Sequence, residues 1–167
     1  HSPYHFPPAG MYSNTTLSGT TFDINQHPKD YFIADLEALD FELGRFMDSL
    51  TVLNLVDSTD FIFMGDNGNA SRVAQNFDTL RAKGTIYQYG VHVPFFIAGP
   101  DVVNPGRSSD ALVNTHDLFA TIIEMFGNTN WQSSIPANKP IDSRSVLPIL
   151  KNQVNQVRDW SFAEMFK

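Results

Sequence analysis

Cysteine is absent from the 167-residue chain, and its absence excludes several kinds of chemistry. These residues can form no disulfide, no cysteine-ligated zinc site and no thiol nucleophile. Positive charge is also scarce, with 11 Lys and Arg against 18 Asp and Glu. The resulting net charge of -7 disfavours non-specific nucleic-acid binding, which needs a basic surface. We therefore expect no nucleic-acid partner.

Long apolar runs are missing as well. No stretch approaches the roughly 20 apolar residues that cross a bilayer, so we expect no membrane span. The chain starts at His1 without a charged and apolar leader. We therefore expect it to be processed or to be a piece of a longer chain, and its compartment stays unknown. Hydrophobic residues make up 42% of the sequence, which is enough for a folded core.

The first half of the chain shows one amphipathic helix and two apolar runs. Between Tyr31 and Leu50 apolar residues recur at steps of three and four, which predicts a helix with an apolar stripe. Asp30 is its expected N-cap. Residues 60–65 predict a buried strand, and residues 91–98 predict a second strand, distorted at its start by Pro94.

The second half continues the alternation of helices and strands. A cap at Asn114 or Thr115 opens a helix that runs to Phe126, with its larger apolar side chains expected to face inward. Residues 143–150 predict a short helix, and residues 160–166 predict a last strand. This alternation favours the α/β class.

Asp66-Asn67-Gly68 directly follows the first predicted strand. Asn-Gly is a strong turn signal, so the triplet is first of all a turn. A carboxylate and an amide oxygen together also suit a hard cation such as Ca²⁺. Ligands of open α/β sheets bind at the carboxyl ends of strands, which is where this triplet lies.

The stretch from Lys83 to Pro94 indicates a function only when it is considered together with that triplet. Alone, Lys83 is a solvated lysine and His92 is a surface or strand histidine. Together the two segments resemble the sulfatase family, whose members carry an apolar strand ending in Asp-Asn-Gly and then a Lys-Gly-Thr-x-Tyr stretch. Further family-like segments follow in the same order, at residues 104–113, 117–127 and 141–150.

The resemblance implies a fold and a domain plan. The expected architecture is a partial alkaline-phosphatase/sulfatase-like α/β sandwich, with a mostly buried sheet flanked by helices. Residues 1–150 correspond to the C-terminal part of the sulfatase catalytic domain. Residues 151–167 correspond to the start of a C-terminal strand or subdomain.

The resemblance also implies roles for individual residues. Asp66 and Asn67 match two calcium ligands of the family. Lys83 matches a sulfate-contacting lysine close to the leaving oxygen, and it has both a catalytic and a substrate-binding role. His5, in His5-Phe6-Pro7, matches a sulfate-contacting histidine that can act as a general acid. His92 stands where the family often has arginine, which makes it a substrate-binding candidate.

The departures from the family pattern are as informative as the matches. The family's Glu-Gly-Gly is Gln88-Tyr89-Gly90 here. The Cys/Ser-x-Pro-x-Arg motif, whose first residue becomes the formylglycine nucleophile, is absent, and so is the family's early pair of Asp. We therefore expect this chain alone to be inactive and to bind calcium weakly, since Ca²⁺ takes six to eight oxygens. An exposed strand edge predicts self-association.

These matches predict a sulfuric ester hydrolase that acts on a sulfate-ester small molecule or a sulfated glycan. Family members are often periplasmic or secreted. Two alternatives stay open. One is a phosphodiesterase, phosphonate hydrolase or phosphoethanolamine transferase of the same superfamily, many of which carry Asp-His-Gly where this chain has Asp66-Asn67-Gly68. The other is a non-catalytic binding module, in which the triplet is only a turn.

Overall fold

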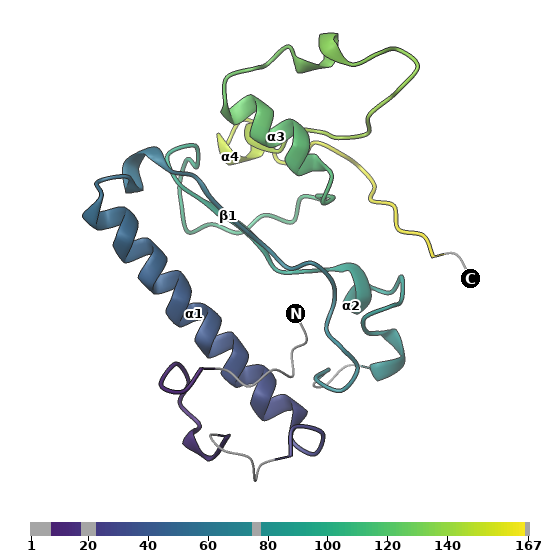
Figure 1. The fold of residues 1–167 in the computed structure, drawn as a ribbon. Helices are drawn as coiled ribbons and strands as arrows, with labels where there is room; N and C mark the ends of the chain where they lie inside the picture. The colour runs from purple at the N-terminus through teal and green to yellow at the C-terminus, as the bar shows by residue number, and fades with distance from the viewer. Residues whose placement is uncertain (1–7, 18–22, 75–77, 166–167) are drawn as a thin grey trace. The chain divides into compact units, whose positions relative to one another are not determined.

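The computed structural model of the chain describes residues 8–17, 23–74 and 78–165 (Figure 1). These residues form two compact units. Of the described residues, one unit comprises residues 8–17, 23–56, 64–74, 78–95 and 165, and the other comprises residues 57–63 and 96–164. Among the described residues no helix combines the length and apolarity that a membrane crossing requires. The α/β class is confirmed, since helices accompany a small sheet.

Helix α1 spans Pro28–Val52 and is the longest element of the structure (Figure 1). It begins three residues before Tyr31, where the sequence predicts its start. Pro28 occupies the first turn, where a missing N–H costs nothing, and His27 is the N-cap. The expectation that Asp30 caps the helix is therefore wrong. Asp30 lies in the first turn, where its negative charge suits the helix dipole.

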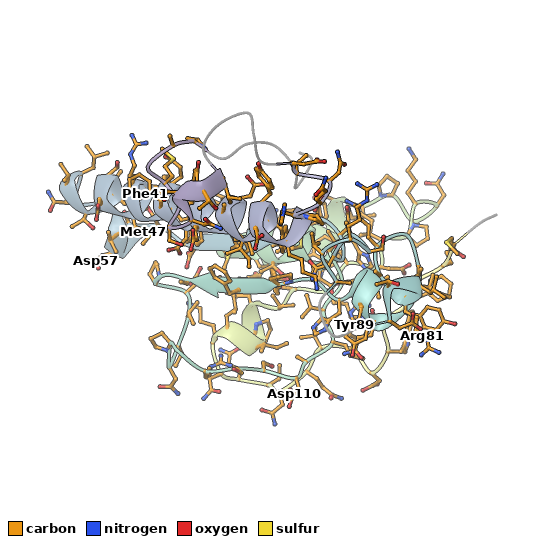
Figure 2. All side chains as sticks on the ribbon, turned by 90° about the horizontal axis from the view of Figure 1, so that it is seen from below. Phe41, Met47, Asp57, Arg81, Tyr89 and Asp110 are labelled. Atoms are coloured by element: carbon orange, nitrogen blue, oxygen red, sulfur yellow. The ribbon has the colours of Figure 1, made fainter. Side chains whose placement is uncertain are left out.

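The buried face of α1 differs from the predicted leucine stripe. Tyr31, Ala34 and Ala38 are the buried residues, and Leu17 packs with the first two in a small core. The predicted stripe is largely uncovered, because Leu36 is 48% exposed and Phe46 is 46% exposed. Phe41 and Met47, labelled in Figure 2, are exposed on the same helix. The contacts of α1 therefore come from Tyr31 and two alanines in its first half, while most of the predicted stripe is exposed.

Two strands form the sheet. Strand β1 spans Phe61–Met64 and pairs with β2, which spans Phe95–Ala98. Phe63 stacks on Phe96 with ring centroids 4.8 Å apart. The backbone N–H of Gly65 donates to the carbonyl of Pro94 at 2.9 Å. Phe63 thus lies opposite Phe96 and Gly65 opposite Pro94. Residue numbers fall along β2 as they rise along β1, so the two strands are antiparallel.

The predicted strands are confirmed in place, with two differences. The sequence predicts a buried sheet, but β1 is only half-buried and β2 alternates between half-buried and exposed residues. The predicted second strand begins after Pro94 rather than at residue 91, because residues 88–91 form the short helix α2 (Gln88–Val91). Proline lacks the N–H that a strand ladder needs, and β2 starts at the next residue.

Helix α3 spans Asp117–Met125, and its inward face is small and polar. Its buried residues are Asp117, Ala120 and Thr121. The expectation that its large apolar side chains face inward is wrong for Phe119, Ile122 and Phe126, which are all exposed. His116, at the N-cap position, precedes the helix.

Asp117 is the polar centre of the second unit. Its fully buried carboxylate accepts hydrogen bonds from the backbone N–H groups of Asn114, at 2.8 Å, and Arg144, at 2.9 Å. It also pairs with the guanidinium of Arg158, whose side chain is 3% exposed. One carboxylate thus ties three segments that are far apart in the sequence.

The last elements are shorter than predicted. The helix expected over residues 143–150 is confined to α4, Leu147–Leu150, with Pro148 in its first turn. Ser143 instead donates its hydroxyl hydrogen bond to the carbonyl of His116 at 2.6 Å. The predicted strand over residues 160–166 is wrong across its described part, because residues 160–165 carry no regular secondary structure.

Candidate functional site

Asp66 and Asn67 lie in the turn that follows β1. Both residues are exposed. The preceding Gly65 is held by the hydrogen bond of its N–H to the Pro94 carbonyl. The carboxylate of Asp66 and the amide of Asn67 therefore lie at the surface, next to a backbone position that this hydrogen bond fixes.

A second loop, residues 78–92, meets this turn through the backbone. The N–H of Lys83 donates to the carbonyl of Asn69 at 2.8 Å. The N–H of Gly68 donates to the carbonyl of Gly90 at 3.1 Å. Two hydrogen bonds thus place the Asp66-Asn67-Gly68 turn against both ends of the stretch that contains Lys83.

Glycine is required where these backbones touch. A Cβ atom on Gly68 would lie 2.1 Å from the carbonyl oxygen of Tyr89. A Cβ atom on Gly90 would lie 2.2 Å from the carbonyl oxygen of Thr85. No side chain fits at such distances, so Gly68 permits the close approach of the two loops and Gly90 permits the Lys83 loop to fold back on itself.

Local interactions shape the Lys83 loop. Asp78 accepts the N–H of Leu80 at 2.9 Å and caps the short 3-10 helix over Thr79–Arg81. The Thr85 hydroxyl donates to the carbonyl of Ala82 at 2.8 Å, and Ala82 is buried. The guanidinium of Arg81 stacks on the Tyr87 ring, 4.7 Å from its centroid. Figure 2 shows Arg81 close to Tyr89, which is a residue of α2.

The predicted site residues fall into two groups. Asp66, Asn67, Lys83 and His92 all lie in the first unit and are all exposed. His92 follows α2, and its N–H donates to the carbonyl of Gln88 at 2.7 Å. Within the described part of the chain, none of these four side chains has a hydrogen-bond or ion-pair partner. His5 and His1 lie outside the described residues.

A family model for sulfatases matches residues 1–128, which include both loops. The chain belongs to the sulfatase family. It is 29% identical over 145 residues to a sulfatase of Formosa agariphila, covering 80% of this chain and 25% of that protein. It is 29% identical over 117 residues to human N-acetylgalactosamine-6-sulfatase, covering 67% of this chain and 22% of that protein.

A solved structure shows the same likeness. The crystal structure of Ps i-CgsB superposes on 76% of this sulfatase chain with a TM-score of 0.64 and 26% sequence identity. The match covers 27% of the Ps i-CgsB chain. The sulfatase chain therefore spans about a quarter of the length of these three relatives.

The donor set of the turn suits a hard cation. Asp66 and Asn67 offer a carboxylate and an amide carbonyl, which are oxygen ligands that Ca²⁺ accepts. Their exposure and their lack of partners in the described residues leave these oxygens available. Within residues 8–17, 23–74 and 78–165, however, no three His, Asp or Glu residues cluster as a metal site would. Two residues supply only part of the six to eight oxygens that Ca²⁺ takes.

The sequence does not predict two features of the site, namely the role of the Asn69 carbonyl and the contact between Gly68 and Gly90. Asn69 contributes through its carbonyl, which any residue type could supply, so its side chain carries no signal. Gly68 and Gly90 do carry a signal, because glycine beside polar site residues indicates a close backbone approach. The sequence does not show that Gly68 and Gly90 lie against each other, because that contact depends on how the residues between them fold.

Proposed function

We propose that this chain supplies the calcium-binding turn and the sulfate-contacting loop of a sulfatase that hydrolyses sulfate esters of sugars. The observation that carries the proposal is the pair of hydrogen bonds from Lys83 to Asn69 and from Gly68 to Gly90. They hold an oxygen-rich turn and a lysine loop together at the surface. Membership of the sulfatase family supports the reaction class.

The chemistry of a sulfate ester fits these groups. The ester is an anion, and its bridging oxygen departs with negative charge. A cationic lysine can bind the non-bridging oxygens and stabilise the charge that develops on the leaving oxygen. Lys83 has no carboxylate partner in the described residues, so its charge remains available for an anionic substrate. His92 can contribute a further hydrogen bond to that substrate.

Asp66 and Asn67 would hold a calcium ion in the whole protein. A bound divalent cation neutralises charge on the substrate's non-bridging oxygens. Asp66 would contribute a negative ligand and Asn67 a neutral one, each presented by the turn that Gly65 and Gly68 anchor. The remaining oxygens would come from residues beyond these two. We therefore propose that the chain alone binds calcium weakly and that it is inactive without a nucleophile such as formylglycine.

The substrate class comes from the relatives. One relative is named N-acetylgalactosamine-6-sulfatase, and on that ground we propose a sulfated sugar as the substrate here. The phospho-ester alternative is the second candidate. It is less well supported, because Asn67 offers an oxygen where many of those enzymes have a histidine, and because the matching family model is that of sulfatases.

A paired hydrolysis assay tests the proposal. The protein as its source makes it would be given an aryl sulfate and the corresponding aryl phosphate, with calcium and with a chelator. We expect the sulfate to be hydrolysed faster and its hydrolysis to fall when calcium is removed. Preferential hydrolysis of the phosphate would favour the phospho-ester alternative. No hydrolysis of any sulfate ester, including sulfated sugars, would favour the binding-module alternative.

A further inference from the structure

The second unit contains an open cavity of about 410 Å³ that the sulfate-ester proposal does not use. One wall is the loop of residues 107–111, which follows β2. The other wall comprises Ile149, Asn152 and residues 154–156, around the end of α4. The volume falls within the roughly 300–1,000 Å³ of small-molecule sites.

Four interactions join the two segments that carry these walls. The N–H of Val103 donates to the carbonyl of Leu150 at 2.9 Å. The guanidinium of Arg107 donates to the carbonyl of Ile149 at 2.5 Å and to that of Leu150 at 3.2 Å. Lys151 forms an ion pair with Asp101. The cavity is therefore formed before any ligand arrives, which lowers the cost of binding.

The charges of the lining nearly cancel. Arg107 contributes a positive charge, but its donors already serve the carbonyl groups at the end of α4. Asp110 contributes a negative charge, and its carboxylate has no hydrogen-bond or ion-pair partner among the described residues. A multiply charged anion would meet that carboxylate without a free cation to offset it. The lining thus favours a neutral ligand.

The remaining lining groups match a hydroxyl-rich ligand. Asp110 is an acceptor, while the amides of Asn152 and Asn155 each both donate and accept. Both amides are exposed and have no side-chain partner in the described residues. Val154 and Ile149 add apolar surface to the same lining. Hydroxyl groups donate and accept hydrogen bonds, and a pyranose ring also presents C–H groups to apolar atoms.

We propose that this cavity binds a neutral saccharide unit. The inference rests on the cavity alone and does not depend on hydrolysis of a sulfate ester. Asp66 and Lys83 belong to the other unit, so loss of either would leave these walls unchanged. Failure of the proposed enzymatic activity is therefore distinguishable from failure of this site.

A titration followed by NMR tests the inference. The ¹⁵N-labelled 167-residue chain would be titrated with the methyl glycosides of glucose, galactose and N-acetylglucosamine. We expect at least one of them to shift the signals of residues 107–111 and 152–156 with saturation. Asp110→Asn should weaken its binding about tenfold, because a charge-assisted hydrogen bond is replaced by a neutral one.

Asp57→Asn is the matched control. It makes the same change of charge at an exposed residue of the same unit that does not line the cavity (Figure 2), so binding should be unchanged. Glycerol and sodium sulfate complete the set of ligands. The inference is overturned if no glycoside shifts these signals, if glycerol or sulfate binds as strongly, or if Asp110→Asn binds like the unaltered chain.

Discussion

At the residue scale, the meeting of Gly68 and Gly90 decides whether the Asp66 turn can reach the Lys83 loop. The N–H of Gly68 donates a hydrogen bond of 3.1 Å to the carbonyl of Gly90. A methyl group at either position would overlap a carbonyl oxygen. The placement of the Asp66 and Lys83 side chains therefore depends on two glycines that carry no functional group.

Replacing Gly68 by alanine should destabilise the first unit and separate the loops. The new Cβ would lie 2.1 Å from the Tyr89 carbonyl oxygen, so the backbone must move. We expect a loss of about 1–3 kcal/mol in the free energy of unfolding, measured by urea denaturation. Gly44→Ala is the control, because its Cβ would meet nothing within 4 Å on α1 and should stabilise by about 0.5–1 kcal/mol. Equal effects would refute the steric explanation.

Asp117→Asn should strongly destabilise the second unit, although it hardly changes the size of the side chain. The substitution leaves the Arg158 charge buried without its partner, which costs about 3–5 kcal/mol in the free energy of unfolding. Asp78→Asn removes an exposed ion pair with Arg81 at 3.4 Å and should cost about 1 kcal/mol or less. Thermal unfolding of both variants would compare them. Similar losses would mean that Asp117 is not the centre of the second unit.

At the element scale, one carboxylate adds a polar attachment between helix α1 and the segment before it, beside the small core of Leu17, Tyr31 and Ala34. Glu37 accepts the N–H of Ser13 at 2.7 Å and its hydroxyl at 2.8 Å. The backbone hydrogen bond, aided by that of the hydroxyl, holds the pKa of Glu37 below its ordinary value of 4.5. Because the folded pKa is depressed, this attachment is fully present above pH 4.5. It is lost as the pH falls through the folded pKa.

An NMR titration of the Glu37 carboxyl group tests this attachment. We expect its midpoint below 4.5 in the unaltered chain and closer to 4.5 in Ser13→Ala, which removes one of the two hydrogen bonds. Ser49→Ala removes another hydroxyl hydrogen bond, to the Arg45 carbonyl, and should leave the midpoint unchanged. A midpoint of 4.5 in the unaltered chain would contradict the attachment.

The sequence predicts an element well when the pattern that specifies it is local, and poorly when the element depends on residues far away in the chain. The period of α1 and the apolar run of β1 are local, so both elements are predicted in place. The strand expected over residues 160–166 fails because a strand also needs a neighbour, which a local pattern cannot supply. The Asp117–Arg158 pair joins residues 41 positions apart, and nothing near either residue predicts it.

The same distinction holds for the site. Asp66, Asn67, Lys83 and His92 are predicted from motifs, and the structure places all four in one unit. The contact of Gly68 with Gly90 is not predicted, because it depends on how the intervening loop folds. Burial is predicted least well. Periodicity identifies the apolar stripe of α1, yet the partner that would cover it is not encoded in the helix.

At the scale of the whole molecule, the uncovered apolar surface has a consequence. Phe46 is 46% exposed and Leu39 is 42% exposed on α1. Exposed apolar groups in series favour association. We therefore expect the chain alone to self-associate in light scattering, with a mass that rises with concentration.

Phe46→Lys should reduce this self-association, because it places a charge in the apolar stripe. Ser49→Lys makes the same change of charge at an exposed polar residue of α1 and should have little effect. A concentration-independent monomer would contradict the prediction. So would equal behaviour of the two variants.

The most direct test of the central claim is the role of Lys83 in the whole protein. The claim is that the loop of Lys83 and the turn of Asp66 and Asn67 together handle a sulfate ester. The measurement is kcat/KM for a sulfate ester, compared between Lys83→Ala and Lys139→Ala. Lys139 is an exposed lysine of the other unit, so the two variants lose the same charge.

We predict that Lys83→Ala lowers kcat/KM by about 10²- to 10³-fold, as the loss of one electrostatic stabiliser does. Lys139→Ala should leave kcat/KM within a factor of about two, since surface substitutions away from a site change free energies by roughly 0.5 kcal/mol or less. Equal activity of the two variants would contradict the claim that these loops form the sulfate site.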